Sequence, residues 1–175
     1  MSRSISVCAV LIALFCNIGA GSGKDQNVLK LQDGTVTAPD GFVWRKMRQE
    51  TKGGRLLVIY GAINKETNAN LSLSIIHEKA EKDAERIEVV VNFVEGTMDA
   101  LKKAGAKNVK LTPPDLRGPL GDKVEFTITF SNPRDDSFVI SGRVYFTKKT
   151  YLIEGLASSN QEAEALVRVT DSLEQ

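Results

Sequence analysis

The chain has 175 residues, of which 42% are hydrophobic, and its 23 Lys and Arg against 22 Asp and Glu give a formal net charge of +1. A chain so close to neutral lacks the basic excess that nucleic-acid-binding domains carry, so we expect no nucleic-acid partner. The length is sufficient for one domain with its own hydrophobic core.

Residues 1–22 are typical of a secretory signal peptide. Arg3 precedes an apolar stretch over residues 5–15, and small residues follow it. The stretch is shorter than the roughly 20 apolar residues of a membrane-spanning helix. We therefore expect cleavage between Ala20 and Gly23, export to the periplasm or the medium, and no stable membrane insertion afterwards. An uncleaved membrane anchor is the alternative.

Both cysteines, Cys8 and Cys16, lie in this segment. The mature chain is therefore expected to contain no disulfide, which fits a bacterial envelope better than a disulfide-rich animal secretion. Lipid attachment at Cys16 is an alternative, but the preceding Phe15 is bulky where lipoprotein signals need a small residue. Loss of Arg3 with the segment leaves 22 basic and 22 acidic residues, a net charge of zero.

Residues 23–27 read as a polar tether, and residues 28–175 as a single α+β domain that begins with strands. Asp33-Gly34 provides a turn for a hairpin within residues 28–37. Apolar runs or an alternation of period two then predict three further strands, the first two connected at Gly53-Gly54. These strands cover residues 42–48, 56–60 and 71–75.

A long amphipathic helix is predicted over residues 83–104, because apolar side chains recur there at intervals of three and four. Lys102 and Lys103 lie at its negative end, and Gly105 is available as its terminator. The apolar positions are Ala84, Ile87, Val90, Val91, Val94, Met98 and Leu101.

Further strands and a last helix are predicted after residue 105. The helix begins at Ser159, where Ser159 and Glu162 have the spacing of a capping box. The alternation of several strands leaves one sheet face rich in Ser and Thr, which solvent, the N-terminal segment or a partner would cover. The strands cover residues 109–111, 123–130, 138–146 and 151–156.

This order of elements resembles the Mog/PsbP-like superfamily. The run Pro39-Asp40-Gly41-Phe42-Val43-Trp44 is similar to the proline, glycine and tryptophan motif of the DcrB-type and LpqN-type bacterial envelope proteins. The closing strand and helix, which ends in Thr170-Asp171-Ser172-Leu173, are similar too. The resemblance implies an α-β-α sandwich from about Val28 to Leu173 and a non-catalytic role, and it supplies no binding residues for this chain.

Candidate chemical groups are few. His77 is the only histidine, and without a second histidine or a cysteine beside it we expect no zinc site. The chain has no Gly-x-Ser-x-Gly elbow for a catalytic serine. Asp135 and Asp136, with Asn132 nearby, could offer oxygen atoms to calcium, but they lack the ligand spacing of an EF-hand. We therefore expect a solvated turn there, no cofactor, no metal and no catalytic residue.

The function predicted from the sequence is a non-enzymatic, protein-binding module of the cell envelope. Trp44, Arg134, Asp135 and Asp136 are the candidate contacts with an envelope protein, although a strand tryptophan is more often part of the core. The first alternative is a small-ligand or calcium-binding protein with a pocket between the long helix and the sheet. The second is a hydrolytic enzyme that uses carboxylates, for example Glu78 with His77.

Overall fold

The computed structural model describes residues 26–52, 55–64, 69–77, 80–116 and 120–174. The predicted signal peptide, the predicted turn at Gly53-Gly54 and the candidate Glu78 lie outside the described residues. Among the helices that are described, none combines the length and the apolar character needed to span a membrane.

The described chain forms a seven-stranded antiparallel sheet of order β3-β4-β5-β9-β8-β7-β6, a separate hairpin and two helices. The hairpin consists of β1 (Val28–Leu31) and β2 (Gly34–Thr37). The helices are α2 (Asp83–Lys103) and α3 (Asn160–Val167), and a 3₁₀ segment η1 (Arg168–Glu174) continues α3. The strands of the sheet are β3 (Arg45–Lys52), β4 (Arg55–Ile63), β5 (Asn70–Ile76), β6 (Lys107–Thr112), β7 (Lys123–Ser131), β8 (Ser137–Phe146) and β9 (Thr150–Ala157).

The sheet consists of two blocks of strands. Sequence neighbours pair within β3-β4-β5 and within β6-β7-β8-β9. In the described residues, the β5–β9 pairing is the connection between the blocks, with Ser72 opposite Glu154. Helix α2 lies between the blocks in sequence.

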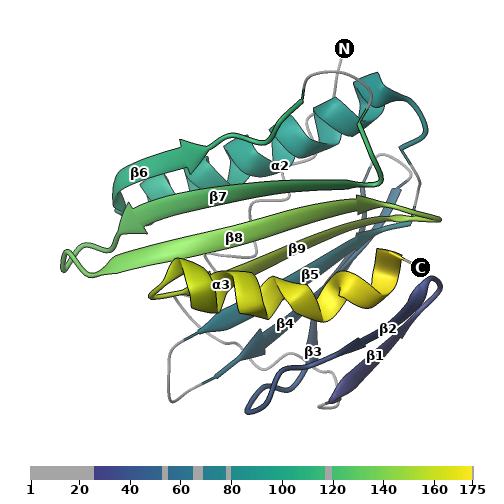
Figure 1. Ribbon diagram of the computed structural model, residues 1–175, viewed down its shortest axis with the longest axis horizontal. Helices are drawn as coiled ribbons and strands as arrows, with labels where there is room; N and C mark the ends of the chain where they lie inside the picture. Colours follow the sequence, from purple (N-terminus) through teal and green to yellow (C-terminus); the bar gives the residue numbers. More distant parts are fainter. Residues whose placement is uncertain (1–25, 53–54, 65–68, 78–79, 117–119, 175) are drawn as a thin grey trace.

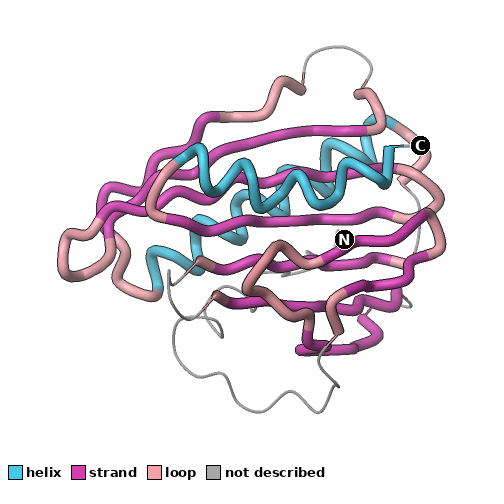
Figure 2. The backbone as a smooth tube through the Cα atoms, turned by 60° about the horizontal axis from the view of Figure 1, so that its bottom comes forward, coloured by secondary structure: helices cyan, strands magenta, loops and turns pink. Residues whose placement is uncertain are grey.

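Helices cover both faces of the sheet (Figure 1). Helix α2 packs on one face through Val90, Phe93 and Val94, in a cluster with side chains of β7, β8 and β9. On the other face, α3 and the β1–β2 hairpin lie over the strands (Figure 2), where Leu166 and Val36 belong to a second buried cluster. The α+β fold predicted from the sequence is confirmed.

The Ser side chains of β5 are buried, whereas Thr129 on the polar side of β7 is exposed, so the Ser- and Thr-rich positions expected from the sequence do not share one environment. Leu71, Leu73 and Ile75 belong to the hairpin-side cluster, so the intervening Ser72 and Ser74 point to the α2 side. Each of these two serines is 3% exposed.

Glu154 lies at the centre of the α2 side of the sheet. The register places Phe126, Gly142, Glu154 and Ser72 in one row across β7, β8, β9 and β5. Glu154 is 4% exposed, and the Thr97 hydroxyl of α2 donates a hydrogen bond of 2.8 Å to its carboxylate oxygen Oε1. A carboxyl group is thus enclosed between the helix and the sheet.

The predicted long helix is confirmed, including its end. Gly105 has φ = +83°, and its N–H donates to the Lys102 carbonyl while the Ala106 N–H donates to the Leu101 carbonyl, each at 3.0 Å. This pattern is the Schellman motif, in which glycine avoids the penalty of a left-handed conformation. Helix α2 therefore ends where the sequence pattern predicts.

Helix α3 begins with half of the predicted capping box. The Glu162 N–H donates to the Ser159 hydroxyl at 3.3 Å. The Glu162 carboxylate instead accepts from the Ser158 hydroxyl at 3.4 Å. The predicted final helix also tightens to 3₁₀ geometry from Arg168 onward.

The predicted strand over residues 42–48 is shifted in the structure. Trp44 makes only an isolated bridge to Gln26, and β3 extends from Arg45 to Lys52. A register shift between Lys46 and Arg48 follows the bridge, and Met47 between them packs against the α2-side core. An irregularity of this kind redirects side chains without a clear sequence signature.

Candidate functional site

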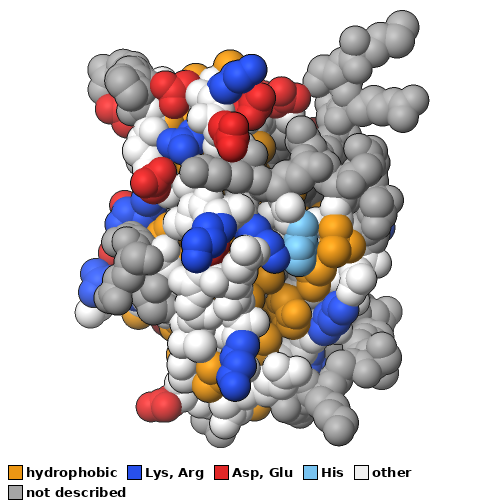
Figure 3. All heavy atoms as spheres, turned by 90° about the vertical axis from the view of Figure 1, so that its right-hand side faces the viewer, with side chains coloured by type: hydrophobic (Ala, Val, Ile, Leu, Met, Phe, Trp, Pro, Cys, Tyr) orange, Lys and Arg blue, Asp and Glu red, His pale blue; other side chains and the backbone are white. Residues whose placement is uncertain are grey.

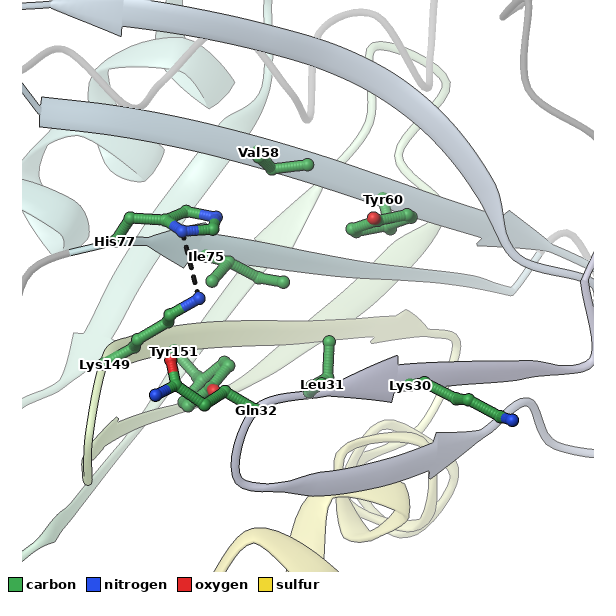
Figure 4. Close-up of a pocket in the computed structure, with 9 residues that line it drawn as sticks. All are labelled: Lys30, Leu31, Gln32, Val58, Tyr60, Ile75, His77, Lys149 and Tyr151. Atoms are coloured by element: carbon green, nitrogen blue, oxygen red, sulfur yellow. Dashed lines mark hydrogen bonds between the residues drawn. The ribbon is translucent and has the colours of Figure 1, made fainter.

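A pocket opens between the β1–β2 hairpin and the adjacent face of the sheet, and we call it the hairpin pocket (Figure 4). Its volume is about 130 Å³. Figure 3 shows the histidine beside a strip of hydrophobic side chains on this surface, with lysine or arginine side chains nearby. The lining residues are Lys30, Leu31, Gln32, Val58, Tyr60, Ile75, His77, Lys149 and Tyr151.

The floor of the hairpin pocket is a row of side chains across three strands. Val58 of β4 pairs with Ile75 of β5, and Ile75 pairs with Tyr151 of β9. Val58 and Ile75 are each 5% exposed and Tyr151 is 0% exposed. Ile75 and Tyr151 belong to the hairpin-side core, and the pairing of the three strands fixes the floor.

His77 and Lys149 form one end of the pocket, because each lies two residues along the chain from the floor row, His77 just after the end of β5 and Lys149 just before the start of β9. A two-residue step keeps a side chain on the same sheet face, and β5 and β9 run antiparallel, so both side chains reach the same end. The backbone N–H of His77 donates a hydrogen bond of 3.0 Å to the Leu56 carbonyl. The Lys149 Nζ lies 3.0 Å from the His77 Nδ1.

Burial and the contact with Lys149 together favour the neutral form of His77. Burial and the Lys149 charge lower the pKa of His77 below its ordinary value of 6.5. The imidazole is therefore neutral at neutral pH. A lysine ammonium group has donors and no acceptor, so Nδ1 accepts from Lys149 and the ring proton is on Nε2. The pair thus offers an N–H donor and an ammonium group with unused protons.

Asp33 fixes the tip of the β1–β2 hairpin to the turn between β8 and β9. Its Oδ2 accepts hydrogen bonds of 2.8 Å from the hydroxyls of Tyr151 and Thr147, and its Oδ1 lies 3.8 Å from the Lys148 Nζ. Burial and the Asp33 carboxylate raise the pKa of Tyr151, so this phenol remains a donor. The hairpin wall of the pocket is thereby held in place.

Replacement of Lys149 by methionine is expected to raise the pKa of His77 toward 6.5, because the neighbouring positive charge disappears while the partial burial remains. A pH titration of the histidine C–H resonances by NMR measures this, and the single histidine makes the assignment unambiguous. Lys110→Met removes an equal charge at an exposed position of edge strand β6 and serves as the control. An unchanged His77 pKa in Lys149→Met would contradict the pairing.

The structure separates the four residues predicted to contact a partner. Trp44 is 0% exposed and belongs to the hairpin-side core, so a partner has no access to its ring in this conformation. Arg134, Asp135 and Asp136 are exposed in the β7–β8 turn. Figure 1 places this turn at the opposite end of the sheet from the turn between β8 and β9.

The β7–β8 turn is organised by its own hydrogen bonds. The Asn132 Oδ1 accepts from the N–H groups of Arg134 and Asp136 at 2.8 and 3.0 Å. Asp135 pairs with Lys107 at 2.9 Å. Among the described residues, no group of three or more His, Cys, Asp or Glu side chains is arranged to hold a metal ion.

The sequence pattern predicted no contact between His77 and Lys149. The pocket expected from the sequence lay between the long helix and the sheet, whereas the hairpin pocket is covered by the β1–β2 hairpin. Comparison of the chain with family models, curated proteins and solved structures finds no match.

Proposed function

We propose that this protein is an exported, non-enzymatic domain that binds a small anion in the hairpin pocket. The observation that carries the proposal is the Lys149 ammonium group, held 3.0 Å from a neutral His77 at the end of an open hollow. None of the nine described residues that line the pocket is acidic. An anion at this end would accept hydrogen bonds from the ammonium group and gain its charge interaction.

Binding fits the groups in the hairpin pocket better than catalysis. The Tyr151 hydroxyl donates to Asp33, and the Asp33 carboxylate is occupied by two hydroxyls and the Lys148 charge. A general acid and base pair needs groups free to exchange protons with a substrate. Asp33 and Tyr151 therefore do not support such a pair, while Glu78, the carboxylate of the predicted hydrolytic alternative, lies outside the described residues.

An envelope protein as partner is the second proposal. The exposed charges of Arg134, Asp135 and Asp136 support it. Stable interfaces usually have a buried apolar centre. Among the described residues, Val28 is the one large hydrophobic side chain that is exposed, at 41%, so a protein partner has less support than an anion.

The two helix-covered sheet faces support the proposed assignment to the Mog/PsbP-like superfamily.

The experiment that tests anion binding uses His77 as the reporter. Sodium phosphate, sodium acetate and sodium benzoate are titrated into the purified protein at constant pH and ionic strength, and the histidine resonances are followed by NMR. We expect a saturable shift with at least one of these anions, and an affinity lowered about tenfold or more in Lys149→Met, as for loss of a charged hydrogen bond.

Lys110→Met is the matched control, because it removes one exposed lysine from the far edge of the sheet. Its affinity should equal that of the wild type. The proposal fails if none of the three anions shifts the resonances, or if Lys149→Met binds as tightly as the control.

A further inference from the structure

We infer that the ligand of the hairpin pocket is a small carboxylate with one negative charge and a compact apolar group, of the size of benzoate. The inference rests on the proposed function and narrows it from anions in general to one chemical class. Three observations carry it: the volume of the pocket, the separation of its polar and apolar residues, and the number of charges that face its interior.

The volume fits one ring or a short branched chain. The pocket has about 130 Å³, and a cavity of about 150 Å³ in another protein holds a benzene molecule. A nucleotide or an oligosaccharide is far larger than this hollow. A phosphate or acetate ion would leave most of the apolar floor without contacts.

The polar and apolar residues occupy different parts of the pocket (Figure 4). His77 and Lys149 face each other at one end, and Gln32 lies near Lys149. Ile75 and Val58 form the floor, and Leu31 and Tyr60 lie farther from the charged pair. A ligand with a carboxylate at one end and an apolar body matches both parts, because burial of the apolar body adds to the charge interaction.

The charges around the pocket favour a single negative charge on the ligand. Lys149 is the cation at the His77 end, while the Lys30 ammonium group points away from the pocket centre in Figure 4. Asp33 lies behind Tyr151 and is partly compensated by Lys148 at 3.8 Å. Among the described residues, one ammonium group faces the pocket, so it can balance the charge of a monocarboxylate but only part of the charge of a dianion such as phosphate.

The test compares four probes by the same histidine resonances. Benzoate has the charge and the ring, acetate has the charge alone, benzamide has the ring without the charge, and inorganic phosphate has more charge without the ring. We expect benzoate to bind at least about tenfold more tightly than each of the others. A tenfold gain needs roughly 60 Å² of buried apolar surface, and a phenyl ring has more than this to bury.

A variant of the apolar wall adds a second measurement. Leu31→Ala shortens a partly exposed wall residue that packs at the edge of the hairpin-side core, and we expect it to lower the benzoate affinity severalfold and to reduce the difference in affinity between benzoate and acetate. Acetate or phosphate binding as tightly as benzoate would overturn this inference and leave the proposed anion site intact. Absence of binding by any anion would overturn the proposed function as well.

Discussion

Replacement of Glu154 by glutamine is expected to stabilise the protein above pH 7 and to remove a loss of stability that the wild type shows as pH rises. Burial raises the pKa of Glu154 from 4.5 to about 7, although hydrogen bonds from Thr97 and Ser72 oppose the rise. The glutamine side chain is close in shape, stays neutral and retains an acceptor for Thr97. Urea unfolding at a series of pH values measures the effect.

The fall in stability with rising pH follows from the raised pKa of Glu154. Between pH 4.5 and about 7 the folded protein holds a proton on Glu154 that the unfolded chain has released. Stability is therefore full below the unfolded pKa and falls as pH rises to the folded pKa. The total loss is roughly 3 kcal/mol at 1.36 kcal/mol for each pKa unit, a large share of the stability of a small domain.

The comparison between wild type and Glu154→Gln isolates this carboxyl group. His77 has a lowered pKa, so its contribution to stability changes with pH in the opposite direction and is present in both proteins. Glu95→Gln, at an exposed position of helix α2, is the control and should keep the wild-type pH dependence. Equal pH profiles for wild type and Glu154→Gln would show that Glu154 is not buried as described.

Gly142→Ala is expected to destabilise the protein by about 3 kcal/mol, the upper range for overpacking a core. A Cβ atom at Gly142 would lie 2.1 to 2.6 Å from three atoms of the Phe126 ring. Phe126 is 3% exposed and its ring meets Phe93 edge to face with centroids 5.8 Å apart. The ring therefore has little room to move. Urea unfolding of the variant and the wild type measures the change.

Two further variants separate this clash from a general effect of alanine. Gly121 has nothing within 4 Å of an added Cβ, so Gly121→Ala should change stability by less than about 0.5 kcal/mol. A smaller side chain in Phe126→Leu makes room, so the double variant with Gly142→Ala should be more stable than additivity requires, by roughly 1 kcal/mol. Strict additivity would contradict a direct contact.

Local features of the fold could be predicted from the sequence, because they depend on residues close together in the chain. The three- and four-residue spacing of apolar side chains predicted α2, and Gly105 predicted its end. The alternation in β7 predicted its buried side. The irregular start of β3 was not predictable, since the bridge between Trp44 and Gln26 depends on where the tether packs.

The hairpin pocket could not be predicted in the same way. His77 and Lys149 are 72 positions apart in the chain, and their contact depends on the pairing and register of two strands that are not neighbours in sequence. A shift of one residue would turn one of the two side chains to the other face. The two-residue spacings, from Ile75 to His77 and from Lys149 to Tyr151, can be seen in the sequence. The pairing of β5 with β9, which brings His77 and Lys149 together, cannot.

The division of the sheet into two blocks has a consequence for the way the chain folds. Each block consists of strands that pair with their sequence neighbours, so local contacts are sufficient to form it. The β5–β9 pairing must instead close a long loop that contains α2, an entropic cost that comes before any gain in contacts. Ser72 and Glu154 face each other across this pairing. The step that joins the two halves of the chain therefore also removes the Glu154 carboxyl group from water.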